Sequence, residues 1–158
     1  MASPQTITLR RDGFDVRFQV PAGWKARMNG SLVEVDAPGS VAFLRVQVAK
    51  TPMSISQIAK GFAADELRKL RKQDPKAFVS RRSVKVGGNP AELVEERYRG
   101  TWVDEKTEIV RVIYFMKSKG TAYEFDCGTT AASFKTMAST FATSISSVHF
   151  LGLGGPSA

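Results

Sequence analysis

The side chains that most often perform chemistry in proteins are scarce in this sequence. It contains one cysteine, Cys127, and one histidine, His149, among 158 residues. A single histidine excludes a histidine-rich metal site, and a single cysteine excludes both an intrachain disulfide and a metal cage made of cysteines. His149 lies between Val148 and Phe150, where a packed or surface role is favoured over general-base catalysis. We therefore expect no metal and no cofactor.

Cys127 is the one candidate nucleophile. A thiol becomes reactive when its pKa is lowered, and Cys127 stands just before a predicted helix N-terminus, which favours the thiolate. However, Tyr123, Phe125 and Cys127 alternate as buried strand residues do. The pattern favours a small core hydrophobe, and an enzyme using Cys127 is kept as an alternative.

The acidic residues do not form an isolated pair for acid–base catalysis. Five glutamates fall on two predicted neighbouring strands: Glu92, Glu95, Glu96, Glu105 and Glu108. Cross-strand ion pairs with Arg97, Arg99 and Arg111 account for them more simply. The sequence thus predicts no catalytic residues.

Two groups of residues are candidates for binding a partner. The first is the segment RYRGTWVDEK, residues 97–106, with Tyr98, Arg99 and Trp102 close to a predicted turn. Tryptophan, tyrosine and arginine are the residues enriched at interface hot spots. Trp102 is either exposed at this turn or folded down over the sheet, and the sequence leaves both alternatives open.

The second group is basic. The net charge is +8, and residues 54–86 carry nine Lys or Arg against three acidic residues. Six of the cations follow one another along a helix end and the next strand: Arg68, Lys69, Arg71, Lys72, Arg81 and Arg82. They predict either a docking patch for an acidic protein or lipid headgroups, or a solvated helix end. Nucleic acid is less expected, because only Phe78 could stack on bases nearby.

The spacing of apolar residues predicts the elements that position these candidates. Alternation predicts strands at 6–10, 14–20, 32–36, 41–49, 78–86, 91–100, 106–117 and 121–127. Helical spacing predicts one helix over 55–72, which begins with a Ser54–Gln57 capping box, and a second helix that opens at 128–130. This order indicates an α+β fold: an antiparallel sheet of about six to eight strands covered by two helices. Residues 1–150 are predicted to form one domain, followed by a Gly/Pro/Ser tail at 151–158.

The stretch PAGW, residues 21–24, predicts the end of a strand. Pro21 lacks an N–H for the ladder, and Gly23 can take the positive φ of a tight turn. Such a turn would bring Trp24 back over the end of the sheet, so we interpret Trp24 as a core residue.

Four stretches carry a family resemblance: FDVRFQVPAGW, MSISQIAKGFAADEL, VKVGGNPAELVEERY and GTAYEFDCGTTAASFKTMASTFATSISSVHF. Together they resemble the PsbP-like superfamily, which includes DcrB-like and LpqN-like proteins. The resemblance implies an α/β/α sandwich and a short terminal strand. Members of this group are mostly binding, assembly or chaperone-like factors, often at membranes, without shared catalytic residues.

The resemblance and the residues together predict a non-catalytic binding or assembly module rather than an enzyme. The expected partner is a protein, and the positive net charge is compatible with an acidic one; a membrane surface and a second copy of the chain are further alternatives. A different function would be a chaperone-like adaptor that cradles an apolar client segment, as type VI secretion effector chaperones of similar fold do. No signal peptide is visible, which predicts a cytoplasmic protein, with a trimmed exported form as the alternative.

Overall fold

The computed structural model describes residues 3–152, which form ten strands, two α-helices and one short 3-10 helix, η1 (Pro38–Ser40). The helices are α1 (Ile55–Gln73) and α2 (Ala131–Ser146). The strands are β1 (Gln5–Leu9), β2 (Val16–Val20), β3 (Lys25–Asn29), β4 (Leu32–Asp36), β5 (Ala42–Lys50), β6 (Phe78–Val86), β7 (Asn89–Trp102), β8 (Glu105–Ser118), β9 (Thr121–Thr130) and β10 (His149–Phe150).

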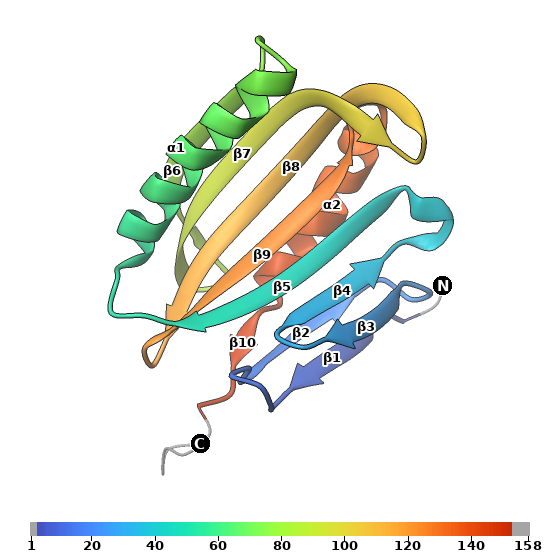
Figure 1. Cartoon of the computed structure of the whole chain (residues 1–158). Coiled ribbons are helices and arrows are strands. Elements are labelled where there is room, and N and C mark those ends of the chain that lie inside the picture. The colour runs from blue at the N-terminus through green and yellow to red at the C-terminus, as the bar shows by residue number, and fades with distance from the viewer. Residues whose placement is uncertain (1–2, 153–158) are drawn as a thin grey trace.

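The strands form two antiparallel sheets (Figure 1). Seven strands lie in the order β3-β4-β5-β9-β8-β7-β6, and β1, β2 and β10 form a separate sheet in the order β1-β2-β10. In the large sheet, β6 to β9 are joined by consecutive hairpins, which is the predicted meander. The sequence predicted neither β3 nor the separation of the N-terminal hairpin into a second sheet.

The two helices lie on opposite faces of the seven-stranded sheet. Along β8, Ile113 and Phe115 pack with α1 residues, whereas Val112 and Met116 belong to the core shared with α2 and the small sheet. Since neighbouring residues of a strand point to opposite faces, these two sets must lie on the two sides of the sheet. The predicted α+β class and the α/β/α arrangement are confirmed.

Helix α1 covers only part of its face of the sheet. It packs on β6, β7 and β8, and Figure 1 shows β5, β4 and β3 lying away from it. We call the part under α1 the covered half, and the part formed by β3, β4, β5 and β9 on that same face the open half. Two features predicted from sequence fix α1 in place: the Ser54–Gln57 capping box, with N–H donations of 3.1 and 3.0 Å, and an end at residue 73 before Asp74-Pro75.

Two local predictions have different outcomes. Trp24 is buried in the core after a turn in which its N–H donates to the Pro21 carbonyl and Gly23 has a φ of 86°, as predicted. The start of the second helix was placed too early. Strand β9 continues through Gly128 to Thr130, and Thr130 caps α2 by accepting from the Ser133 N–H. Backbone pairing with β5 and β8 keeps these residues in the strand.

Candidate binding site on the open half

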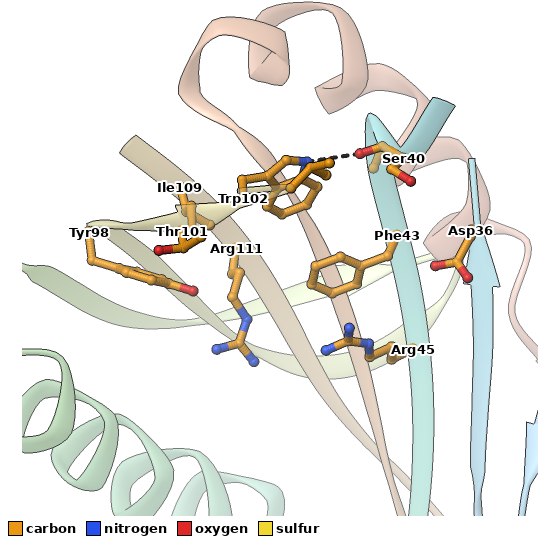
Figure 2. Close-up of a pocket in the computed structure, with 11 residues that line it drawn as sticks. Asp36, Ser40, Phe43, Arg45, Tyr98, Thr101, Trp102, Ile109 and Arg111 are labelled. Atoms are coloured by element: carbon orange, nitrogen blue, oxygen red, sulfur yellow. Dashed lines mark hydrogen bonds between the residues drawn. The ribbon is translucent and has the colours of Figure 1, made fainter. Parts of the chain in front are cut away.

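A cavity of about 400 Å³ lies where the open half meets the tip of the β7–β8 hairpin. Figure 2 shows the side chains around it, which come from β4, η1, β5, β7 and β8. Its lining is Asp36, Ser40, Ala42, Phe43, Arg45, Tyr98, Thr101, Trp102, Val103, Ile109 and Arg111. Aromatic and arginine side chains dominate this wall.

Trp102, Phe43 and Arg45 form a stack along one wall. The rings of Phe43 and Trp102 lie 5.7 Å apart at an interplanar angle of 15°, and the Arg45 guanidinium carbon lies 4.1 Å from the centre of the Phe43 ring. Figure 2 shows Trp102 and Arg45 on opposite sides of Phe43. The Trp102 indole N–H also donates to the Ser40 carbonyl at 2.8 Å. Trp102 therefore folds toward β5 and is half-buried, which decides between the two alternatives left by the sequence.

A glycine on the neighbouring strand makes room for this stack. Phe43 is paired in register with Gly128 of β9, and a Cβ on Gly128 would stand 2.3 Å from the Phe43 ring. Any side chain there would displace the ring. A glycine inside a strand often marks a place where another group approaches the backbone closely. The sequence analysis missed this meaning of Gly128 because it placed the residue at the start of a helix.

Arg45 has no acidic partner among the residues that the structure describes. The two residues paired with it in register are both acidic, Glu34 on β4 and Asp126 on β9. Each is held by another arginine: Arg27 donates to Glu34 at 2.8 Å, and Arg111 donates to Asp126 at 3.1 Å. The Arg45 Nε is buried and has no hydrogen-bond acceptor. A buried donor without an acceptor costs about 1–3 kcal/mol.

Arg111 holds a cluster of three carboxylates at the boundary between the covered and open halves. Its guanidinium bonds Asp126 on β9, Glu96 on β7 at 3.0 Å and Glu66 on α1 at 3.1 Å. Glu96 is fully buried and Asp126 nearly so. The sequence predicted cross-strand pairing of Arg111 with glutamates, and the Glu96 contact confirms it. The contact with Glu66 fastens α1 to the sheet beside the cavity.

Burial changes the ionisation of this cluster. Loss of water raises the pKa of Glu96 to about 8, opposed by the charge of Arg111. Burial also raises the pKa of Glu124, on the same face of β9, to about 7. The carboxylates around Arg111 raise its own pKa despite burial, so it stays charged. Near neutral pH Glu96 therefore holds a proton, and the two remaining carboxylates, Asp126 and Glu66, more than balance the single charge of Arg111.

The rim of the cavity is apolar and exposed. Val41 and Val103 are 41% and 65% exposed, and both lie next to residues of the Trp102 contact. Val103 and Asp104 form the two-residue turn of the β7–β8 hairpin with φ of 45° and 68°. Positive φ is unfavourable for a β-branched residue, so a valine here costs stability. The rim thus exposes an apolar residue in a strained position.

Comparisons with known proteins rest on the fold. No family model and no curated protein matches the chain by sequence. The solution structure of cyanobacterial PsbP (CyanoP) from Synechocystis sp. PCC 6803 is 19% identical with a TM-score of 0.66, over 95% of this chain and 94% of that one. The chain has the PsbP-like fold.

Two further solved structures are similar in fold. LpqN of Mycobacterium tuberculosis, described as involved in cell envelope biogenesis, is 15% identical with a TM-score of 0.53, over 84% of this chain and 81% of that one. A variant of the protein Mog1 is 13% identical with a TM-score of 0.61, over 96% and 98%. At these identities the likeness establishes the fold, which is the fold that the resemblance in the sequence implied.

The three binding candidates of the β7–β8 hairpin do not all lie at the cavity. Tyr98 and Trp102 both line the cavity, and Tyr98 is half-buried against Gly100. The side chain of Arg99 is exposed, and its backbone N–H donates to Asp74 at 2.8 Å. The sequence analysis named Tyr98 and Trp102 as candidates but missed Phe43 and Arg45. The alternation of side chains along β5 indicated a strand and gave no sign of a binding site.

The six basic candidates do not form one patch. Arg81 and Arg82 are neighbours on β6 and so point to opposite faces, where they pair with Glu92 and Glu95. Arg68 pairs with Asp65 one turn earlier on α1. Lys69, Arg71 and Lys72 are exposed at the end of α1, with the Arg71 Nε donating to the Ala77 carbonyl at 3.4 Å. A docking role for these cations stays a prediction.

Cys127 and His149, the two residues considered for catalysis, do not line the cavity. Cys127 is fully buried on the opposite face of β9, where burial raises the pKa of its thiol, as expected for a core hydrophobe. His149 is exposed on β10, opposite Arg17. The helix start that would have activated Cys127 lies farther along the chain, at Ala131.

A second, more apolar cavity of about 260 Å³ lies at the other end of β5, between Val48, Ile58, Phe115 and Tyr123. The charged side chains of Arg45, Glu124 and Asp126 share this face between the two cavities. The chaperone-like alternative requires a continuous apolar groove, which these charges interrupt.

None of the helices in the described part of the chain is long and apolar enough to cross a membrane.

Proposed function

We propose that this protein is a non-catalytic binding or assembly module and that a protein partner docks on the open half, over the cavity beside Trp102. The observation that carries the proposal is the Trp102–Phe43–Arg45 stack, which lies at the edge of a sheet face that α1 leaves uncovered. A tryptophan and an arginine held in fixed positions are the usual anchors of an interface.

The rim supports a protein partner. Large apolar side chains rarely face water in groups, and the exposed Val41 and Val103 are the chain neighbours of Ser40 and Trp102, which a hydrogen bond joins. Their exposure gives a cavity with a largely polar lining an apolar edge, and interfaces combine apolar and polar contacts in this way. The PsbP-like fold is compatible with this role and does not identify the partner.

The basic end of α1 is a second candidate surface for the same function. Lys69 and Lys72 are exposed there and neither bonds another described residue, so they could add attraction for an acidic partner. Charges at the edge of an interface mainly affect the rate of association. We therefore place the main binding energy at Trp102 and a smaller contribution at the end of α1.

Affinity purification from the cells that make the protein tests this proposal, followed by titration of the purified partner. Trp102→Ala removes the anchor, whereas Val103→Asp leaves the stack in place and adds a charge to the apolar rim. Both variants are expected to weaken the partner at least tenfold, about 1.4 kcal/mol. Arg68→Glu combined with Lys69→Glu should mainly slow association.

The matched control is Lys135→Ala, an exposed residue of α2 on the opposite face of the sheet. It should bind like the original protein, and circular dichroism should show all variants folded. Unchanged affinity of both Trp102→Ala and Val103→Asp would refute docking on the open half. Loss of binding only in the Arg68/Lys69 variant would move the interface to the end of α1.

A further inference from the structure

The cavity contains a cation whose natural partners are occupied. Glu34 and Asp126 lie in register on either side of Arg45, but they bond Arg27 and Arg111. Asp36 also lines the cavity, yet it is paired with Phe43 rather than with Arg45. The Arg45 guanidinium therefore has no ion-pair partner, and its buried Nε has no acceptor, in the described part of the chain.

The position of this cation is fixed from two sides. Its guanidinium carbon lies 4.1 Å from the centre of the Phe43 ring, and Phe43 stacks on Trp102 and occupies the space over Gly128. Figure 2 shows the guanidinium groups of Arg45 and Arg111 reaching into the same space, from β5 and β8. A planar guanidinium held in this way presents a fork of N–H donors, the geometry that binds a carboxylate through two parallel hydrogen bonds.

We infer that the open half receives an acidic side chain of the protein partner, whose carboxylate binds the Arg45 guanidinium beside the Trp102–Phe43 stack. This rests on the proposed function and adds the chemistry of the partner: one carboxylate, with apolar neighbours that contact Val41 and Val103. The net charge of +8 favours the approach of such a segment.

The charge of the cavity favours a carboxylate over a phosphate. Arg111 is already bonded to Asp126, Glu96 and Glu66, so of the two guanidinium groups that line the cavity only that of Arg45 has no ion-pair partner in the described part of the chain. The single positive charge of Arg45 matches the single negative charge of a carboxylate. A phosphate group carries a charge of about −2 and is usually held by several cations. Asp36 and Asp126 nearby would also repel a dianion more strongly.

The experiment uses two short capped peptides that differ in one residue, a glutamate between leucine and alanine and the same peptide with glutamine. The protein has two tryptophans, so its NMR spectrum contains two indole N–H signals. Trp102 reports on the cavity, and Trp24, buried in the core, is an internal reference. The glutamate peptide should shift the Trp102 signal with roughly millimolar affinity and leave the Trp24 signal unchanged.

Substitution of Arg45 completes the test as a double-mutant cycle. In Arg45→Gln the glutamate peptide should bind about tenfold more weakly, at the level of the glutamine peptide, and the glutamine peptide should not respond to the change. Arg45→Lys, which keeps the charge but loses the planar fork, should be intermediate. The matched control is Arg17→Gln, an exposed arginine of β2, which should leave both affinities unchanged.

Three results would overturn the inference. They are equal affinity for the two peptides, equal loss of both peptides in Arg45→Gln, and a Trp102 shift with inorganic phosphate as large as that with the glutamate peptide. In each case the proposed function would still stand if the natural partner required Trp102. Conversely, a partner that ignored Trp102 would refute the proposed function even if the peptide result held.

Discussion

The two halves of one sheet face differ in how their side chains are satisfied. In the covered half, Val94, Ile113 and Phe115 are buried against Ala59 and Phe62 of α1. In the open half, the same face of β4, β5 and β9 carries charged residues and the Phe43 ring, and most of these are half-exposed. The sheet is continuous across both halves, so the difference lies in what covers it.

The comparison teaches which features of the open half need a partner. Where a helix covers the sheet, apolar side chains complete their packing inside the molecule. On the open half the carboxylates Glu34 and Asp126 are satisfied by arginines, whereas the Arg45 Nε and the exposed Val103 are not satisfied by any described residue. Arg45 and Val103 both line the same cavity, which is why we place the interface there.

Removing one phenylalanine from each half measures this difference directly. Phe115→Ala should lower the free energy of unfolding by about 4 kcal/mol, because it leaves a void between α1 and the sheet. Phe43→Ala should cost about 1.5 kcal/mol, because its ring is half-exposed. Urea denaturation monitored by circular dichroism provides both values. Similar losses in the two variants would show that the open half is as well packed as the covered half.

The fold could be predicted because its signals are local. The alternation along β6 to β9, the capping box at Ser54 and the Pro21–Trp24 turn each depend on neighbours in sequence, and all three were correct. Strand β3 has no such signal: four of its five residues are exposed, so its sequence does not alternate. It forms a strand because β4 provides a partner for its backbone.

The boundary between the halves is a second place to test the comparison, through pH. Burial raises the pKa of Glu96 from 4.5 to about 8, so the folded protein binds a proton that the unfolded chain releases above pH 4.5. The corresponding stability is fully present below pH 4.5 and is lost as the pH rises through 8. Between pH 5 and pH 9 the free energy of unfolding should fall by on the order of 2 kcal/mol.

Glu96→Gln replaces the protonated acid by a neutral amide and should flatten this pH dependence. Glu95→Gln is the matched control, because Glu95 is the adjacent residue, points to the opposite face and pairs with the partly exposed Arg82. The unfolding free energy is measured by urea titration at each pH. If Glu96→Gln kept the full slope, the proton would have to reside on another group of the cluster.

The candidate site was only half predictable, for a related reason. Tyr98 and Trp102 attract attention by residue type beside a turn, but Phe43 and Arg45 look like ordinary strand residues. Their importance comes from pairings distant in sequence: Phe43 lies over Gly128, and the two acids beside Arg45 are bonded to Arg27 and Arg111. The sequence pattern does not show which arginine binds which carboxylate, because the pairing depends on the register of four strands.

The smallest effect is expected at the hairpin tip, and its sign separates stability from binding. The β6–β7 and β8–β9 hairpins turn at Gly87-Gly88 and Lys119-Gly120, whereas the β7–β8 hairpin turns at Val103-Asp104 with the same positive φ. Asparagine adopts this conformation more easily than valine, so Val103→Asn should raise the free energy of unfolding by about 1 kcal/mol. The same substitution removes an apolar side chain from the rim and should weaken binding of the partner several-fold.

Asp104→Gly is the control, since it relaxes the turn and keeps Val103; it should stabilise the protein without weakening binding. A Val103→Asn variant that bound as tightly as the original protein would mean that the strained valine serves no interface, and the exposed rim would then have to be removed from the proposed docking surface.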